Sequence, residues 1–375
     1  MLRRIPLTLV LGLAIIGVCE ALLLVDAARR GWATVPLPPG AYLPMPHGWL
    51  ERAARWVAVN MTAVCWVGYL LTFDGLLTWL ARRRGSETIS SIRSRPNRFL
   101  VAWLTSIPVW CVFDWINFYY MDAWRYHGLP PLFAQRLLGY FIAFAAISPG
   151  MFLAAQLYQH LGVRRLRTTA AAGPAWGLTL GVLFTLAVVI VLVILGLDVA
   201  EERRRFLLAS ATVLVVPGLL MLIWKRCLFL TSFAFGLGFT GWAIYVHDPI
   251  GNLALWVGMI FLLDPVNAKM LGQPSLLLDW RAGRWGRTAA LFLGGATCGL
   301  CWEFWNFWAL AKWTYHLPFL GAAAGVRYFE MPLLGFLGFL PFAAECWVML
   351  NVIVGLLERA KLRVAEPLPS DDDVM

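Results

Sequence analysis

The stretch Trp302-Glu303-Phe304-Trp305-Asn306-Phe307-Trp308, followed by Trp313-Thr314-Tyr315-His316, decides how this chain is interpreted. It sets one carboxylate and one carboxamide into an apolar, aromatic segment. Ionisable side chains inside membrane-spanning helices are costly, and they mark functional sites by default. The spacing of three residues places Glu303 and Asn306 on one face of a helix. Both residues are therefore functional candidates.

A second stretch has the same order of residues. Asp114-Trp115-Ile116-Asn117-Phe118 is followed by Trp124-Arg125-Tyr126-His127, and the acid, Asn, Trp, Tyr and His each precede their counterparts by 189 positions. Farther out, Trp66-Val67-Gly68 recurs as Trp256-Val257-Gly258, 190 positions later. Self-similarity at a fixed offset predicts an internal duplication.

The composition indicates a membrane protein. Of 375 residues, 60% are hydrophobic and 14% are charged, whereas an average soluble domain has about 25% charged residues. A helix needs about 20 apolar residues to cross a bilayer. About ten runs meet this condition, and they cover residues 5–25, 56–80, 99–121, 136–159, 175–197, 206–224, 227–246, 250–266, 288–310 and 328–357.

The predicted fold is an all-α polytopic integral membrane protein, with two parallel four-helix repeats joined by a helical hairpin. Six spans separate each element from its counterpart, so both copies have the same orientation in the bilayer, as in parallel repeats. The predicted units are a first repeat (1–172), a connecting transmembrane hairpin (173–225), a second repeat (226–360) and a disordered cytoplasmic tail (361–375). The tail is predicted to be disordered because it is acidic and contains proline. No chemistry is assigned to it.

The net charge of +10 fixes topology and does not indicate a nucleic-acid partner. Basic clusters lie between the apolar runs, and nearly all of them fall on one side when the spans alternate, as the positive-inside rule requires. Both termini are then cytoplasmic, and we expect a multi-pass protein of the cell inner membrane. The first apolar run is long for a secretory signal and is interpreted as an uncleaved span.

Four carboxylates are the predicted catalytic residues: Glu303, Asp114, Glu330 and Glu345. A buried carboxyl group can stay protonated at neutral pH and act as an acid. In the alternative interpretation, the Asn, Tyr and Trp neighbours of Glu303 and Asp114 cap these acids, which then only hold helices together. The alternative to a catalytic role for Glu330 is an interfacial carboxylate at a helix N-terminus. The alternative for Glu345 is an ion pair.

The predicted substrate-binding residues are polar or aromatic neighbours of these acids. Aromatic faces stabilise cations, although aromatic residues also gather at membrane interfaces without any site. The set is Asn306, Asn117, Trp302, Trp305, Trp313, Tyr315, His316, Trp124, Tyr126 and His127.

Other polar residues in the apolar runs are given structural roles or none. The histidines are scattered, and a single Cys298/Cys301 pair is a weak signal, so no metal site and no cofactor are predicted. Asp74 and Asp264 lie near Arg82 and Lys269, and they are interpreted as members of structural salt bridges.

The order of these residues resembles a known family. An acid with an Asn, then Trp-x-Tyr, then a proline with a carboxylate on the next span looks like the repeat of the heterodimeric or fused membrane lycopene cyclases and of the carotenoid hydratases. The matching residues are Glu303, Asn306, Trp313, Tyr315, Glu330 and Pro332, with Asp114, Asn117, Trp124 and Tyr126 in the first copy. Those cyclases carry a Glu-Glu pair after the proline, where this chain has Leu333-Leu334.

The resemblance implies a cofactor-independent membrane enzyme, an isomerase or lyase of carotenoid or other isoprenoid biosynthesis. It would act on an isoprenoid, carotenoid-like or other lipid substrate by redox-neutral proton transfer, in a cyclisation, isomerisation or hydration. The alternative is a transporter or receptor for a small lipid or a proton-coupled solute, because parallel repeats with intramembrane acids also describe transporters. The expected partners are the bilayer and the lipid substrate, and the oligomeric state stays open.

Overall fold

The computed structural model of the chain describes residues 5–38, 40–85, 90–167, 200–205, 207–208, 228–249, 251–318, 320, 325–362, 365–366, 368 and 373–375. Within these ranges the chain is mostly helical. Seven helical segments are long and apolar enough to cross a membrane: Leu7–Arg29, Trp49–Arg83, Pro96–Met121, Phe133–His160, Leu228–Tyr245, Ala254–Leu271 and Leu333–Arg359. The chain is therefore of the all-α membrane type.

The elements follow one another as α1 (Leu7–Arg29), α2 (Trp49–Arg83), α3 (Ser91–Ser94), α4 (Pro96–Ile116), the π-helix η1 (Asn117–Met121), β1 (Trp124–His127), α5 (Phe133–Leu138), the π-helix η2 (Gly139–Phe144), α6 (Ala145–His160), η3 (Val163–Arg165), α9 (Leu228–Tyr245), α10 (Gly251–Val266), the π-helix η6 (Asn267–Leu271), α11 (Leu276–Arg281), α12 (Gly286–Trp308), β2 (Lys312–Tyr315), β3 (Arg327–Tyr328), β4 (Met331–Pro332), the 3-10 helix η8 (Leu333–Gly338) and α13 (Phe339–Arg359).

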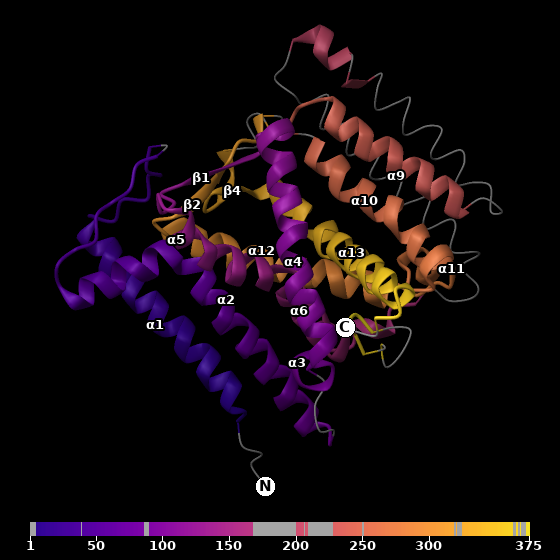
Figure 1. Cartoon of the computed structure of the whole chain (residues 1–375), viewed down its shortest axis with the longest axis horizontal. Helices are drawn as coiled ribbons and strands as arrows, with labels where there is room; N and C mark the ends of the chain where they lie inside the picture. The colour runs from indigo at the N-terminus through magenta and orange to yellow at the C-terminus, as the bar shows by residue number, and fades with distance from the viewer. Residues whose placement is uncertain are drawn as a thin grey trace.

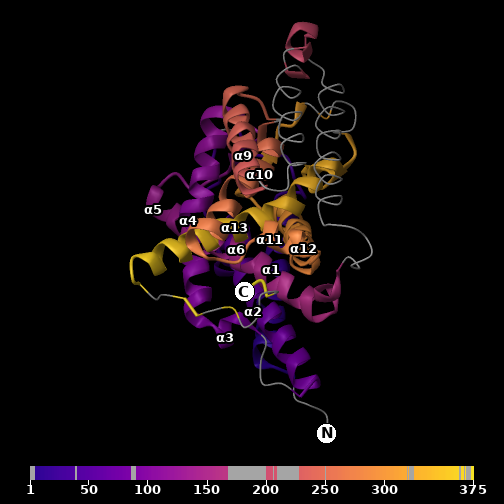
Figure 2. The same cartoon turned by 90° about the vertical axis from the view of Figure 1, so that its right-hand side faces the viewer.

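The long helices form two outer pairs and a central group. Figure 1 shows α1 beside α2 on one flank and α9 beside α10 on the other, with α4, α6, α12 and α13 between them. Within the central group α12 packs against both α6 and α13, while α2 contacts α6 and α10 contacts α13. The view turned by 90° shows α12 and α13 crossing in the middle of the molecule (Figure 2).

Each outer pair packs closely at a glycine. A Cβ added to Gly68 on α2 would lie 2.7 Å from Ile16 of α1, and one added to Gly258 on α10 would lie 2.9 Å from Thr240 of α9. Small residues let neighbouring membrane helices approach until their backbones are nearly in contact. The two glycines are 190 positions apart and face the partner helix in the same way.

Most of the predicted spans in the described part of the chain coincide with helices, and one differs at its start. Helix α12 lies where the run 288–310 predicts a helix, although it is not among the seven segments that are long and apolar enough to cross a membrane. The run 328–357 was predicted to be helical throughout, which is wrong at its start. Residues 327–332 form the hairpin β3–β4, with Phe329 at a φ of 54°, and α13 begins only at Phe339. Pro332 cannot donate an intrahelical hydrogen bond, so the helix forms after it.

Two predicted units are described only in part. Of the connecting hairpin 173–225, only residues 200–205 and 207–208 are described, so the spans 175–197 and 206–224 lie outside it. Of the tail 361–375, the described residues include 373–375, and Val374 and Met375 are completely buried. The backbone of these residues is hydrogen-bonded to side chains of α6 and α13, and the disorder of the tail stays a prediction.

Candidate functional site

Two short strands join segments that are far apart in the sequence. β1 and β2 pair antiparallel, with Trp124 opposite Tyr315 and Tyr126 opposite Trp313. Side chains alternate between the faces of a strand, so these four aromatic residues share one face, and all four line one cavity. The strand pair thus forms an aromatic roof over the centre of the helical group.

An asparagine holds each strand in place. Asn306 Nδ2 donates to the Trp313 carbonyl at 2.8 Å, and its Oδ1 accepts from the Trp313 N–H at 2.9 Å. Asn117 makes the same two bonds with Trp124, at 2.8 and 3.1 Å. Both amides are thereby used by backbone groups, which makes their role structural. The predicted substrate-binding role of Asn306 and Asn117 has no support in these contacts.

Each strand also carries a tyrosine whose hydroxyl donates a hydrogen bond to a carboxylate of the preceding helix. Tyr315 Oη donates to Glu303 Oε1 at 2.6 Å, and Tyr126 Oη donates to Asp114 Oδ1 at 2.9 Å. The indole of Trp124 also donates to Asp114, at 2.9 Å. Burial raises the pKa of both tyrosines well above the usual value, so their hydroxyls keep their protons and act as donors.

The two acids differ in their access to the site. Asp114 lines a cavity directly. Glu303 is completely buried behind Tyr315, and its Oε2 atom has no hydrogen-bond partner among the residues described. An unpaired polar atom at such a depth is unusual and needs an explanation. Its hydrogen bond to the roof is with the Tyr315 hydroxyl, at 2.6 Å.

Two adjoining cavities lie under the aromatic roof, and together they are here called the aromatic chamber. One measures about 50 Å³ and the other about 120 Å³, and Tyr126, Trp302 and Trp313 line both. The smaller cavity is walled by Trp110, Phe113, Trp124, Tyr126, Trp256, Trp302, Trp313, Tyr315, Met331, Phe339 and Phe342. The larger one is reached by Asp114, Lys312, Trp66 and residues of η2.

The rings of the chamber form a connected cluster. Trp302 lies 5.2 Å from Trp110, 5.4 Å from Trp313 and 6.0 Å from Trp66 between ring centroids. These separations are typical of favourable aromatic contacts. Trp302, a predicted substrate-binding residue, is thus at the centre of the wall.

The predicted acid Glu330 is engaged in an ion pair. It lies in the β3–β4 turn, and its carboxylate contacts Lys312 Nζ, with side-chain exposures of 14% and 3%. Lys312 Nζ also donates to the carbonyls of Phe307, at 2.9 Å, and Thr34, at 3.1 Å. Burial lowers the pKa of the Lys312 ammonium, while the Glu330 carboxylate raises it. The geometry favours a structural role for Glu330.

Glu345 is the most isolated of the predicted acids. It is completely buried on α13, and neither carboxylate oxygen has a partner in the described part of the chain. It follows Phe342 by one helical turn, on the same face of the helix, and Phe342 lines the chamber. The alternative of an ion pair is not supported by the observed contacts.

The remaining predicted residues lie around the chamber. His127 bridges the Leu37 carbonyl (3.1 Å) and the Thr314 hydroxyl (2.9 Å) on the outer face of the strand pair. His316 is 54% exposed and lies 3.7 Å from Asp122. Trp305 lines a separate groove between α1, α2 and α12. These three side chains are therefore not brought to the acids.

Several wall residues were not predicted from the sequence. Trp110, Phe339 and Phe342 lie in apolar runs where nothing distinguishes them from core packing. Trp66 and Trp256 repeat at an offset of 190, which was a usable signal. Lys312 was also missed, although a lysine between two aromatic segments is a local anomaly.

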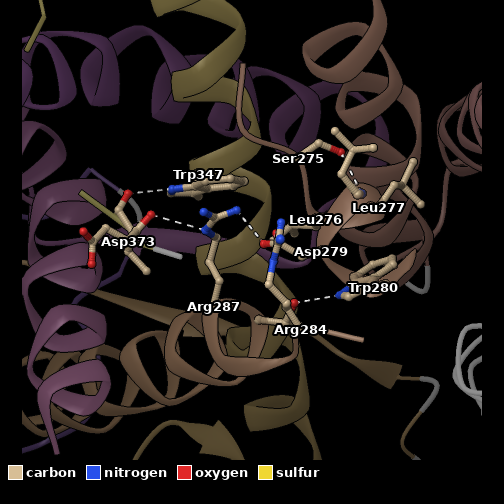
Figure 3. A network of polar contacts seen from close by, with 12 residues as sticks. Ser275, Leu276, Leu277, Asp279, Trp280, Arg284, Arg287, Trp347 and Asp373 are labelled. Carbon is tan, nitrogen blue, oxygen red and sulfur yellow. Dashed lines mark hydrogen bonds and ion pairs between the residues drawn. The ribbon is translucent and has the colours of Figure 1, made fainter. Parts of the chain in front are cut away.

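The two deeper aspartates have structural roles, with partners other than those predicted. Asp74 pairs with Arg93 at 2.9 Å. Asp264 accepts from the Ser275 hydroxyl at 2.5 Å and from two backbone N–H groups, those of Leu276 and Leu277, each at 2.9 Å. It therefore anchors the start of α11, where Ser275 and its neighbours lie in Figure 3, and this replaces the expected salt bridge.

Fold and site together define a helical membrane-type protein with acids beside an aromatic chamber. Comparison of the chain with protein-family models, with curated proteins and with solved structures finds no match.

Proposed function

We propose that the protein is a membrane enzyme that catalyses redox-neutral proton transfer on an isoprenoid, carotenoid-like or other lipid substrate. One observation carries the proposal. Two carboxylates, Asp114 and Glu303, each accept a hydrogen bond from a tyrosine hydroxyl. The two tyrosines belong to the strand pair that covers the aromatic chamber. The resemblance to membrane lycopene cyclases and carotenoid hydratases points to the same chemistry.

The proposed reaction starts with a proton donated to a carbon–carbon double bond. The resulting carbocation is stabilised by the aromatic faces of the chamber, and loss of a proton from a neighbouring carbon gives an isomer. Attack by water on the cation gives a hydrated product instead. General acid–base catalysis of this kind needs a positioned carboxyl group in a site that excludes water. Asp114 is the acid with direct access to the chamber.

The second carboxylate would act through its tyrosine. Glu303 lies behind Tyr315, whose hydroxyl donates to it and accepts from the Trp313 indole at 2.8 Å. A proton taken up from the chamber would pass through this hydroxyl to Glu303. The chamber volumes of about 50 and 120 Å³ suit the reacting end of a long substrate, so the rest of such a molecule would extend into the bilayer.

The same proposal includes the architecture expected from the sequence: about ten spans, two parallel repeats, and a place in the cell inner membrane with both termini cytoplasmic. The strand register supports the duplication. Adding 189 to Trp124 and Tyr126 gives Trp313 and Tyr315, so the pair Trp124–Tyr315 is exchanged with the pair Tyr126–Trp313. A twofold relation between two copies has this property.

The test is lipid mass spectrometry on cells with and without the protein. We expect a species isomeric with its precursor, or heavier by one water. Asp114→Asn and Glu303→Gln should each abolish that species while the protein stays folded. Asp122→Asn is the matched control, because Asp122 is half exposed and paired with Arg125. Retention of the product in both acid variants would disprove the assignment.

A second candidate, a transporter or receptor for a small lipid, is favoured by a different observation. A groove of about 720 Å³ lies between α1, α2 and α12, with Glu20 as its only carboxylate and Trp305 and Phe304 in its wall. Flux or binding of lipid in proteoliposomes, with no new lipid species in cells, would favour this candidate over the enzyme.

A further inference from the structure

The last three described residues, 373–375, are buried and are contacted by side chains of several helices. Asp373 is 9% exposed, and Val374 and Met375 are completely buried. The contact residues come from the start of α4, from α6, from α12 and from α13, and they are Arg95, Gln156, Gln159, Arg287 and Trp347. This set is called the tail socket below.

The socket recognises the backbone of the bound segment. Trp347 Nε1 donates to the Val374 carbonyl at 2.7 Å, and Gln156 Nε2 donates to the Met375 carbonyl at 2.6 Å. Gln159 accepts from the Val374 N–H at 3.2 Å. Buried backbone groups that are paired in this way define a specific binding geometry.

Arginines surround the same segment. Arg287 Nε donates to the Asp373 carbonyl at 3.3 Å, and Arg95 donates to that of Met375. The Asp373 carboxylate lies 3.5 Å from Arg164. In Figure 3, Arg287 lies beside Trp347 with Asp279 on one side and Asp373 on the other. Its guanidinium lies 4.7 Å from the centre of the Trp347 ring.

A second acidic position of the tail is also held. The Glu366 carboxylate accepts from the backbone N–H groups of Asn97, at 3.2 Å, and Arg98, at 2.8 Å. These groups belong to the first turn of α4, where a helix has unpaired donors and a positive dipole end. The tail is thus attached at two places by groups that favour negative charge.

The socket joins the two halves of the chain. Gln156 and Gln159 are on α6, whereas Arg287 and Trp347 are on α12 and α13. The same three helices carry chamber residues, namely Ile147, Trp302 and Phe342. A segment bound in the socket therefore ties together helices that also form the wall of the chamber.

We propose that the tail socket is a peptide-binding site for acidic segments and that the chain's own residues 373–375, with Glu366 held at the start of α4, act as a detachable strap. The ligand class follows from backbone recognition by Trp347 and the two glutamines, together with the surrounding arginines. The proposal is independent of the chemistry assigned to the chamber.

The experiment uses a variant that lacks residues 363–375, in detergent micelles, and a fluorescein-labelled peptide of residues 364–375. Fluorescence anisotropy should show that the peptide binds the shortened protein. It should bind the intact protein at least about tenfold more weakly, since a tethered segment competes at a high effective concentration. A peptide of the same length in which every Asp and Glu is replaced by Asn and Gln should bind weakly to both, because it no longer matches the arginines of the socket.

Variants of the socket make the test specific. Trp347→Phe replaces the indole by a smaller aromatic ring and removes the N–H that donates to the Val374 carbonyl, so it should weaken peptide binding about tenfold. Trp242→Phe is the matched control, because the buried Trp242 indole N–H has no partner in the described part of the chain. Equal binding of the neutral peptide, or no binding to a folded shortened protein, would overturn the proposal.

A measurement on the intact chain covers the case in which the shortened protein does not fold. In a background without other reactive cysteines, Val374→Cys should react with a polar maleimide far more slowly than Leu362→Cys, which is exposed. Adding Trp347→Phe should speed the reaction at position 374. Equal rates at positions 374 and 362 would show that the segment is not bound.

Discussion

At the scale of single residues, the site separates groups that look equivalent in the sequence. Asn306 and Glu303 are three residues apart on one helix, yet Asn306 is fully used by the backbone of β2 while one oxygen of Glu303 is unpaired among the residues described. Glu330 and Glu303 are both carboxylates near the roof, yet only Glu330 has a cation beside it within that same part of the chain. The hydrogen-bond and ion-pair partners of these side chains, and not their residue types, indicate which of them are structural.

The structural role of Asn306 predicts a stability effect. Asn306→Ala removes two hydrogen bonds and leaves both backbone polar groups of Trp313 buried, which should lower the free energy of unfolding by roughly 2–4 kcal/mol. Titration with SDS, followed by circular dichroism, measures this change. Asn60→Ala is the control, since Asn60 bonds only to the Trp56 carbonyl of its own helix, and its effect should be small. A stable Asn306→Ala variant would contradict the structural role.

The ion pair of Lys312 and Glu330 should behave as a coupled unit. Lys312→Met or Glu330→Gln alone leaves a buried partner uncompensated, and each should cost about 3 kcal/mol of stability. The double variant Lys312→Met/Glu330→Gln should cost clearly less than the sum of the two single variants, because no unpaired charge remains. Thermal unfolding in detergent gives the three values. Additive effects would mean that the pair contributes nothing by its pairing.

At the scale of elements, two kinds of segment behave differently. The long apolar helices form where hydropathy predicts them, since a helix satisfies its own backbone groups inside the bilayer. The four-residue strands β1 and β2 form only because each finds the other 189 positions away and because an asparagine holds each end. No local pattern in so short a segment distinguishes a strand from the end of a helix.

The packing of α1 on α2 gives a prediction at this scale. Gly68→Val adds atoms where a Cβ would already lie 2.7 Å from Ile16 and 3.0 Å from the Gly12 carbonyl. Such overpacking should cost about 1–3 kcal/mol. Gly17→Val on α1 is the matched control, because nothing lies within 4 Å of a Cβ at that position. Equal thermal stabilities of the two variants would argue against the close approach of α1 and α2.

At the scale of the whole molecule, two contacts join parts of the chain that are far apart in the sequence. The β1–β2 pair joins the two predicted copies above the chamber, and the tail socket joins α6 to α12 and α13 at another place. Helices α6, α12 and α13 take part in both junctions. A shift of any of these helices at one junction would therefore also move residues of the other junction.

The strand pairing can be tested by cross-linking. Arg125 and Thr314 are directly opposite in the register, and opposite residues of antiparallel strands have Cα atoms about 4.5–5.5 Å apart, within the range for a disulfide. Arg125→Cys/Thr314→Cys should therefore form a disulfide on mild oxidation, detected as a joined peptide by mass spectrometry. The single variants should give none. Failure of the double variant to cross-link would contradict the predicted contact.

The sequence by itself determined the membrane class and the positions of most long helices, and it predicted a site at the Asp114 and Glu303 segments. These follow from hydropathy and from the cost of polar groups in lipid, which act locally along the chain. The tertiary structure alone decided that Asn306 and Asn117 are structural, that Glu330 pairs with Lys312 and that residues 373–375 are buried. Each of these depends on a partner brought close by folding, or on a hydrogen-bond geometry that residue type does not encode.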